Sequence, residues 1–195
     1  PTTQPLTVVI LGAGLGTRMK SQTPKVMHSV LGQPLLEYVL QSTQPLEAAN
    51  TVVVVGHGRD QVIAHLQQSH PSVTAATQHE QRGTGHAVRT ALEQLGGVTE
   101  GSVLVLAGDA PLITAEDLTA LVAARHGVAA SVLTAHLDDP SGYGRIVRDG
   151  SDHVAEIVEH ADADNAQRDI TEVNSGVYVF DAQYLQDALN RIGTG

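Results

Sequence analysis

The chain has 195 residues with 42% hydrophobic content, which suits one large or two small compact units with a real core. A formal net charge of −10 and 3% aromatic residues leave too few cations and stacking rings for nucleic acid, which is not expected as a partner. Apolar runs all fall short of the roughly 20 residues that cross a bilayer, and no signal pattern opens the sequence. We therefore expect no membrane insertion and a cytoplasmic location.

Strands and helices are expected to alternate along most of the chain. The expected strands are 6–11, 51–56, 73–77, 102–107 and 129–136, separated by helices near 34–43, 59–69, 84–95 and 114–126. This alternation predicts an α/β fold with a Rossmann-like, doubly wound and mostly parallel sheet. Beyond 138–140 the pattern changes to shorter strands near 143–148, 153–159 and 172–180, then a helix from about 181 to 191. We interpret this last part as a separate subregion.

A glycine-rich turn follows the first strand directly. Gly12, Gly14 and Gly16 permit backbone conformations closed to other residues and let phosphate oxygens approach peptide N–H groups. Arg18 and Lys25 supply positive charge nearby. Ligands of open parallel sheets bind beyond the carboxyl ends of the strands. The segment therefore predicts a site for a nucleoside triphosphate.

Two better-known glycine motifs do not fit this segment. A dinucleotide fingerprint counted from Gly12 needs glycine at position 17, which is Thr17, and the strand ending at Gly56 lacks the following acidic residue. A Walker loop needs glycine and lysine five and six residues after Gly12, and these are absent. Hydride transfer and ordinary P-loop chemistry are both disfavoured.

Five motifs occur in a fixed order along nearly the whole chain. They are GAGLGTRMKSQTPKVMH at 12–28 with its preceding leucine, QHEQRGTGHA at 78–87, LAGDAPL at 106–112, SGYGRIV at 141–147 with IVEH at 157–160, and EVNSGVYVF at 172–180. Together they resemble the sugar nucleotidyltransferases, specifically the uridylyltransferase module of bacterial N-acetylglucosamine-1-phosphate uridyltransferases. The resemblance implies the nucleotide-diphospho-sugar transferase fold. It also implies a single domain over 1–195, with a nucleotide-binding part at 1–137 and a sugar-binding part at 138–195.

The reaction that the resemblance implies joins UTP and N-acetylglucosamine 1-phosphate to give UDP-N-acetylglucosamine and pyrophosphate. Positioning and charge neutralisation carry such a transfer. The family's pattern assigns Arg18 to the triphosphate and Lys25 to substrate phosphate, as catalytic residues. The nucleotide is expected to lie against the turn, at Leu11, Gly12, Ala13 and Gly14. The alternative is a surface arginine and lysine in a mobile loop.

Uracil recognition is expected from the second motif. By resemblance, Gln78 and Gly83 contact the base and Thr84 lies beside them. An amide side chain with backbone groups can satisfy the two carbonyls and one N–H of uracil. The alternative is a helix cap by Thr84, with Gln78 as a solvated strand end.

A Mg²⁺ site is expected at Asp109, which follows the strand 102–107. Mg²⁺ takes few protein carboxylates and fills its other positions with water and substrate phosphate oxygens. Ala107 and Gly108 complete this part of the expected substrate site, and the alternative for Asp109 is a helix or turn cap. In the resembling enzymes an asparagine further along the chain is a second metal ligand. The printed sequence stops at Gly195, before that segment, so we expect this chain to be a fragment or a truncated relative.

The sugar side is expected at Gly144, Glu159 and Asn174, which match the family's GYGR, VEH and NSG motifs. A carboxylate and an amide are natural partners of sugar hydroxyls. Turn or exposed-strand positions are the alternative for all three. Ala107 stands where the family often has a larger polar or aromatic residue, so the acyl preference is left open.

Two other functions are considered beside this one. One is a different nucleotidyltransferase, using glucose 1-phosphate with dTTP or UTP, or a molybdopterin guanylyltransferase. The other is a non-catalytic module that binds nucleotide sugars. In the resembling bacterial proteins a left-handed β-helix with acetyltransferase activity follows and assembles homotrimers, and none of it is present in these residues. The ten histidines form no HExxH or His-Cys pattern and are expected mostly at the surface.

Overall fold

The computed structural model describes residues 4–14, 21 and 23–192. The chain forms two compact units, one of residues 1–131 and 178–195 and the other of residues 132–177. Strand β10 (Glu172–Asp181) runs through both, so the chain returns to the first unit at Tyr178. The boundary expected from the sequence, between residues 137 and 138, separates a nucleotide-binding part from a sugar-binding part. It does not describe compact units, and it stays a prediction.

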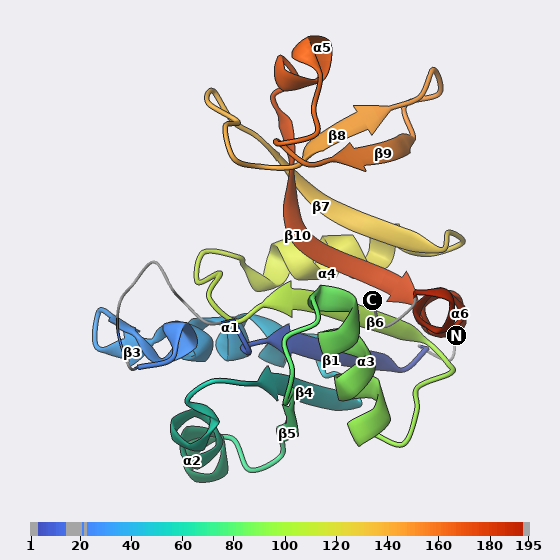
Figure 1. Cartoon of the computed structure of the whole chain (residues 1–195). Coiled ribbons are helices and arrows are strands. Elements are labelled where there is room, and N and C mark those ends of the chain that lie inside the picture. The colour runs from blue at the N-terminus through green and yellow to red at the C-terminus, as the bar shows by residue number, and fades with distance from the viewer. Residues whose placement is uncertain (1–3, 15–20, 22, 193–195) are drawn as a thin grey trace. The chain divides into compact units, whose positions relative to one another are not determined.

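A parallel sheet forms the centre of the first unit. Its strands are β5 (Thr74–Thr77), β4 (Asn50–Val55), β1 (Leu6–Leu11) and β6 (Ser102–Ala107), in that spatial order (Figure 1). The last residues of β10 pair with β6 in the antiparallel direction. The α/β fold expected from the sequence is therefore confirmed, with four parallel strands; the eight-stranded sheet as a whole is mixed, because β10 and the strands beyond it add antiparallel pairs.

Strand β7 (Ala130–His136) departs from the simple alternation. The sequence pattern places it as the fifth strand of the parallel succession, but it pairs with β10 instead. The edge of β6 that faces away from β1 is occupied by β10. This pairing joins segments more than 35 residues apart, so local periodicity could not reveal it.

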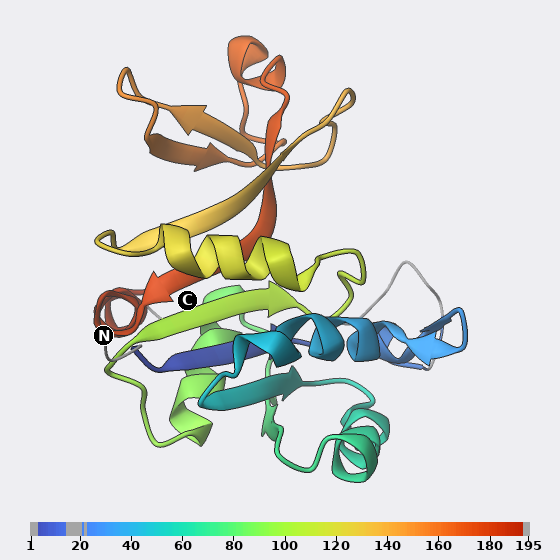
Figure 2. The ribbon, with the colours of Figure 1, turned by 180° about the vertical axis from the view of Figure 1, so that it is seen from behind.

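Helices cover both faces of the sheet, because alternate residues of each buried strand point to opposite faces. Helices α3 (Thr84–Gln94) and α6 (Ala182–Arg191) lie on the face seen in Figure 1, where Val9, Val52 and Val105 pack against Leu92 and Leu189. Helices α1 (Leu35–Thr43) and α4 (Ala115–Ala124) contact each other and lie over the opposite face (Figure 2). Helix α2 (Arg59–Ser69) contacts β4 and β5.

The second unit contains an antiparallel hairpin of β8 (Arg145–Arg148) and β9 (Val154–Val158), with β10 beside β8. Arg148 donates two hydrogen bonds to Glu172, from Nε to Oε2 at 2.8 Å and from Nη2 to Oε1 at 2.7 Å. These bonds lower the pKa of Glu172 from 4.5 to about 2. The pair fastens β10 to the β8–β9 hairpin.

Five short elements were not expected from the sequence. They are the 3-10 turns at Lys25–Met27 and Gln44–Leu46, the two-stranded sheet of β2 (Ser29–Val30) and β3 (Gln33–Pro34), and helix α5 (Asn165–Arg168). Each has four residues or fewer, too short for a periodic hydrophobic pattern. The longer expected elements are confirmed to within about two residues at most ends. Among the described helices, none has the length and apolarity to span a membrane.

Candidate functional site

Two glycine turns pack closely at the carboxyl ends of β1 and β4. The Gly12 N–H donates to the carbonyl oxygen of Val54 at 2.8 Å. A Cβ atom on Gly56 would lie 2.9 Å from the carbonyl oxygen of Ala13, closer than real Cβ atoms approach backbone. Residue 56 must therefore be glycine for the turn after β1 to pack as it does.

The end of β6 joins the same cluster of turns. The Gly108 N–H donates to Leu11 O at 2.9 Å, and the side chain of Val26 packs against both Gly12 and Gly108. Val26 is 3% exposed, so it anchors the segment that carries Lys25 against these two turns. Packing of one buried valine thus places Lys25 next to the end of β6.

Lys25 and Asp109 form an ion pair in this region, between Lys25 Nζ and Asp109 Oδ2. The side chains are 47% and 24% exposed, so both can reach a ligand that approaches from solvent. Asp109 offers a hard carboxylate oxygen, the donor type that Mg²⁺ prefers. The two residues assigned to substrate phosphate and to metal are therefore neighbours.

Gln78 orders the loop that precedes α3. It is 5% exposed, and its Nε2 donates to His86 Nδ1 at 2.9 Å and to Gly83 O at 3.4 Å. Because both of these partners are acceptors, the amide nitrogen faces them and Oε1 faces the other way. Gln81, from the same loop, donates through Nε2 to the carbonyl oxygen of Ala13. The loop is thereby tied to the turn after β1.

A cavity of about 370 Å³ lies between this loop and the turn after β1. It is lined by Leu11, Ala13, Gly14, Gln78, Gln81, Gly83, Thr84 and Ala87. Thr84 begins α3 but does not cap it, since the N-cap is Gly83 and no side-chain hydrogen bond caps the helix among the described residues. The open N–H groups of the first turn therefore remain available to acceptor atoms of a ligand.

Most of the predicted nucleotide-side residues are brought together here. Leu11, Ala13, Gly14, Gln78, Gly83 and Thr84 line the cavity, Gly12, Ala107 and Gly108 lie in the adjoining turns and strand end, and Lys25 pairs with Asp109. Arg18 and Gly16 lie outside the described residues. The sequence analysis did not assign Gln81, Gly56 or Val26 to the site. A second glutamine in QHEQRG and a glycine closing a second strand were the available signals for two of them.

The three predicted sugar-side residues meet within the second unit. A Cβ atom on Gly144 would lie 3.4 Å from Glu159 Oε1 and 3.7 Å from Asn174 Cβ. The Asn174 N–H donates to Gly144 O at 2.9 Å, and Asn174 Oδ1 accepts from the Gly176 N–H at 2.9 Å. Residues 30 positions apart therefore form one local cluster with carboxylate and amide groups.

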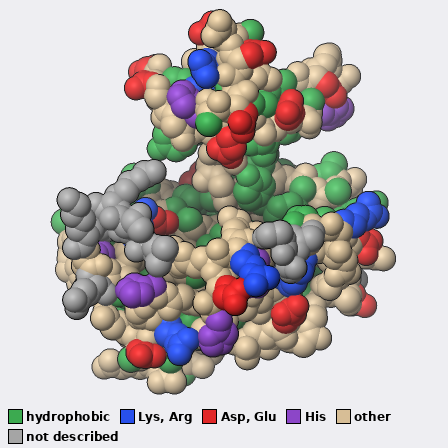
Figure 3. All heavy atoms as spheres, viewed as in Figure 1, with side chains coloured by type: hydrophobic (Ala, Val, Ile, Leu, Met, Phe, Trp, Pro, Cys, Tyr) green, Lys and Arg blue, Asp and Glu red, His purple; other side chains and the backbone are tan. Residues whose placement is uncertain are grey.

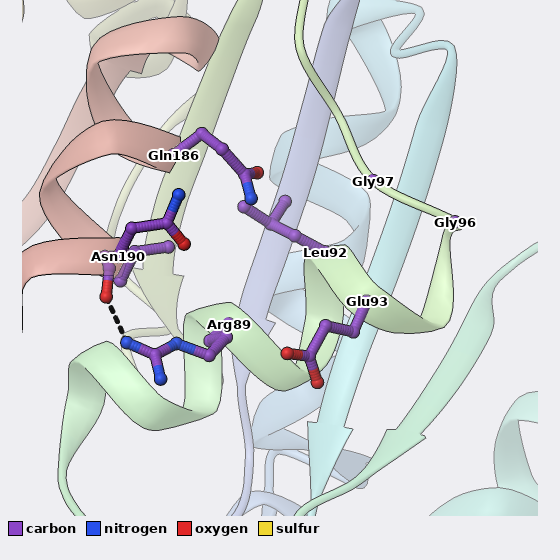
Figure 4. Close-up of a pocket in the computed structure, with 8 residues that line it drawn as sticks. Arg89, Leu92, Glu93, Gly96, Gly97, Gln186 and Asn190 are labelled. Carbon is purple, nitrogen blue, oxygen red and sulfur yellow. Dashed lines mark hydrogen bonds between the residues drawn. The ribbon is translucent and has the colours of Figure 1, made fainter. Parts of the chain in front are cut away.

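Figure 4 shows a larger cavity, of about 530 Å³, between α3 and α6. Arg89 borders it and donates to the carbonyl oxygens of Leu189 and Ile192 at the end of α6, the second at 3.0 Å. This arginine satisfies carbonyls that a helix end leaves without partners. None of the predicted residues lines this cavity, so its size does not make it the candidate site.

Charged side chains are dispersed on the face shown in Figure 3. Lys and Arg side chains appear at several places there, some of them beside acidic side chains. Lys25 is placed beside Asp109 by the packing of Val26 against Gly12 and Gly108.

The fold is shared with solved structures. A putative glucose-1-phosphate thymidylyltransferase from Bacillus anthracis superposes with a TM-score of 0.79 over 97% of this chain and 76% of that one, at 18% identity. HddC from Yersinia pseudotuberculosis gives a TM-score of 0.73 over 93% of this chain and 79% of that one, at 23% identity. These likenesses confirm the nucleotide-diphospho-sugar transferase fold.

The chain belongs to the MobA-like NTP transferase domain family, whose model matches residues 8–177. It is 54% identical over 194 residues to bifunctional protein GlmU of Streptomyces avermitilis, and 48% identical over 194 residues to that of Thermobifida fusca. The matches cover 98% and 97% of this chain but 40% of each relative. The resemblance drawn from the five motifs is confirmed, and the chain spans about two fifths of the length of these relatives.

Proposed function

We propose that the chain transfers a uridylyl group from UTP to N-acetylglucosamine 1-phosphate, giving UDP-N-acetylglucosamine and pyrophosphate. The observation that carries this proposal is the Lys25–Asp109 pair, at the end of β6 and packed through Val26 onto the glycine turn after β1. Membership of the NTP transferase family and about 50% identity to bifunctional proteins GlmU support it.

In the proposed reaction an oxygen of the sugar 1-phosphate attacks the α-phosphorus of UTP. The bond from that phosphorus to the oxygen bridging to the β-phosphate breaks, and pyrophosphate leaves with the bond's electron pair. The Lys25 ammonium group offsets negative charge as the two phosphate groups approach, and the backbone N–H groups of Ala13 and Gly14 orient the polyphosphate. Arg18 remains the second predicted cation of this step.

Asp109 fits a Mg²⁺ site by donor chemistry and by exposure. Its carboxylate is 24% exposed and lies at a strand end beside a phosphate-binding lysine, so substrate oxygens could complete the coordination. When bound, Mg²⁺ would neutralise phosphate charge and help to orient the leaving pyrophosphate. Asp109 also holds Lys25 in place, which pre-orients the ammonium group before substrate binds.

The proposed base pocket is the cavity beside Gln78. The N–H of uracil N3 is a donor, and Gln78 Oε1 faces away from the two acceptors that hold its amide nitrogen. Uracil carbonyl oxygens can accept from open N–H groups at the start of α3, at Thr84 and the residues after it. Cytosine has an acceptor at N3, so the same amide disfavours it.

Sugar hydroxyls are assigned to the second unit, where Glu159 can accept and Asn174 can donate and accept. Gly144 lies close to both, since a Cβ atom there would lie 3.4 Å from Glu159 Oε1 and 3.7 Å from Asn174 Cβ. The small side chain of Ala107 leaves the acyl preference of the enzyme open. Homotrimer assembly of a longer parent protein and a cytoplasmic location remain predictions.

The test is a coupled pyrophosphate-release assay with Mg²⁺ and two proteins. One is this chain, and the other is the Streptomyces avermitilis relative with this chain in place of its matched residues. Turnover with UTP and N-acetylglucosamine 1-phosphate, well above that with dTTP or glucose 1-phosphate, supports the proposal. Turnover with another pair only would show that the substrates are wrong. UTP binding without turnover in both proteins would indicate a non-catalytic module.

A further inference from the structure

Three side chains that could bind a metal ion gather away from the candidate nucleotide site. Glu37 is on α1, His65 is on α2, and His70 caps the end of α2. Glu37 Oε2 lies 3.1 Å from His65 Nε2 and 2.8 Å from His70 Nε2, and the donor atoms all lie within 4.8 Å of one another. None of these residues belongs to the five motifs or to the 370 Å³ cavity.

We propose that Glu37, His65 and His70 bind a divalent transition-metal ion of the Zn²⁺ class. Two imidazole nitrogens and one carboxylate oxygen are ligands typical of Zn²⁺, whereas Mg²⁺ and Ca²⁺ prefer oxygen ligands throughout. Bonds of about 2.0–2.1 Å in a tetrahedral site place donors about 3.3 Å apart. The observed separations from Glu37 Oε2 need to open by only a few tenths of an ångström.

The cluster is oriented and partly sheltered from water. The exposed fractions of the Glu37, His65 and His70 side chains are 18%, 19% and 25%, which leaves a path for the ion and for a water as fourth ligand. Gln41 donates from Nε2 to Glu37 Oε1 at 3.2 Å, so the other carboxylate oxygen is the one turned to the imidazoles. Outer contacts of this kind fix the direction of a metal ligand.

The ligands sit on regular backbone rather than on a loose loop. Glu37 and His65 project from helices α1 and α2, and the His70 N–H donates to Leu66 O at 2.7 Å. Helix α1 and the end of α2 thus set the positions of the three ligands.

A bound ion would join α1 to the end of α2. Because such binding requires the folded arrangement, saturation should raise the Tm, by about 5–10 °C at a hundredfold excess over Kd. This effect needs no substrate, so it is measured separately from nucleotide transfer. Failure of the metal proposal would leave the proposed transfer reaction intact, and the reverse also holds.

The experiment uses the chelator-treated chain without nucleotide. Zn²⁺ affinity is measured by competition with a chromophoric chelator, and Co²⁺ is added to read the visible absorption of an imidazole-bound ion. We expect one equivalent per chain, with at least tenfold weaker binding in each of His65→Gln, His70→Gln and Glu37→Gln. The matched control is His126→Gln, an exposed histidine beyond α4, which should bind as the unchanged chain does.

A second measurement needs no variant. In ¹H–¹⁵N spectra of the imidazole rings, Zn²⁺ should shift the Nε2 signals of two of the ten histidines, His65 and His70. The proposal is overturned by the absence of a stoichiometric site at micromolar Zn²⁺, by shifts confined to other rings, or by equal affinity in the His65 and His126 variants. Because these imidazole shifts are measured in the unchanged chain, they test the proposal even if a variant fails to fold.

Discussion

Replacing Gln78 with leucine separates base recognition from loop order. The 2.9 Å bond to His86 Nδ1 is a normal neutral hydrogen bond, worth about 1 kcal/mol, and the 3.4 Å bond to Gly83 O adds little. His86 is half-buried and Gly83 exposed, so water can replace the lost donor at both. The leucine also fills nearly the same space. The free energy of unfolding should therefore fall by only about 1 kcal/mol.

The effect on UTP affinity should be larger. A bound uracil N3–H that loses its acceptor without gaining a water costs about 1–3 kcal/mol, which is about a 5- to 150-fold rise in Kd. CTP affinity should change much less, so the preference for UTP over CTP should shrink toward equality. Calorimetry with each nucleotide gives Kd, and urea unfolding of the same samples gives stability. Gln67→Leu, on the exposed face of α2, is the matched control.

Two results would refute this reasoning. Unchanged UTP affinity in a folded Gln78→Leu variant would show that the amide does not contact the base. A stability loss above about 3 kcal/mol, with UTP and CTP affinities falling equally, would show that Gln78 acts only by holding the loop.

Three further predictions concern charge, packing and pH. Lys25→Met should lower kcat/KM at least a hundredfold. It should change the free energy of unfolding by less than about 1 kcal/mol, because the ion pair with Asp109 is partly exposed. Steady-state kinetics in which the variant turns over UTP as fast as the unchanged chain would contradict this. Gly56→Ala should lower the free energy of unfolding in urea by about 1–3 kcal/mol, because the new Cβ atom would clash with the Ala13 backbone. The control Gly14→Ala has open space around its Cβ atom and should change this free energy by no more than about 0.5 kcal/mol. Similar losses in the two variants would exclude the packing argument. With its pKa lowered from 4.5 to about 2, Glu172 should add at most about 3 kcal/mol of stability, fully present above pH 4.5 and lost as pH falls toward 2. Arg148→Met should remove that part of the pH dependence, which unfolding at pH 6 and pH 3 would reveal, and an unaltered slope would disprove the assignment.

The sequence by itself determined most of the elements and predicted the kind of site. Buried parallel strands such as 6–11 and 102–107 are continuous apolar runs bounded by proline or glycine, and this local pattern needs no knowledge of partners. The order of the motifs identified the family and the strand-end residues from Leu11 to Asp109. The carboxyl ends of parallel strands share one edge of a sheet, so these residues were expected to meet, and those described do.

Only the tertiary structure decided which distant side chains touch. The antiparallel pairing of β10, the Gln81 bond to Ala13 and the approach of Glu37 to His65 and His70 all join residues 28 or more positions apart. Hydrophobic periodicity specifies which face of a helix is buried, but not which helix lies beside it. Two histidines five residues apart match no metal motif, and they become a candidate metal site only because packing brings α1 against the end of α2.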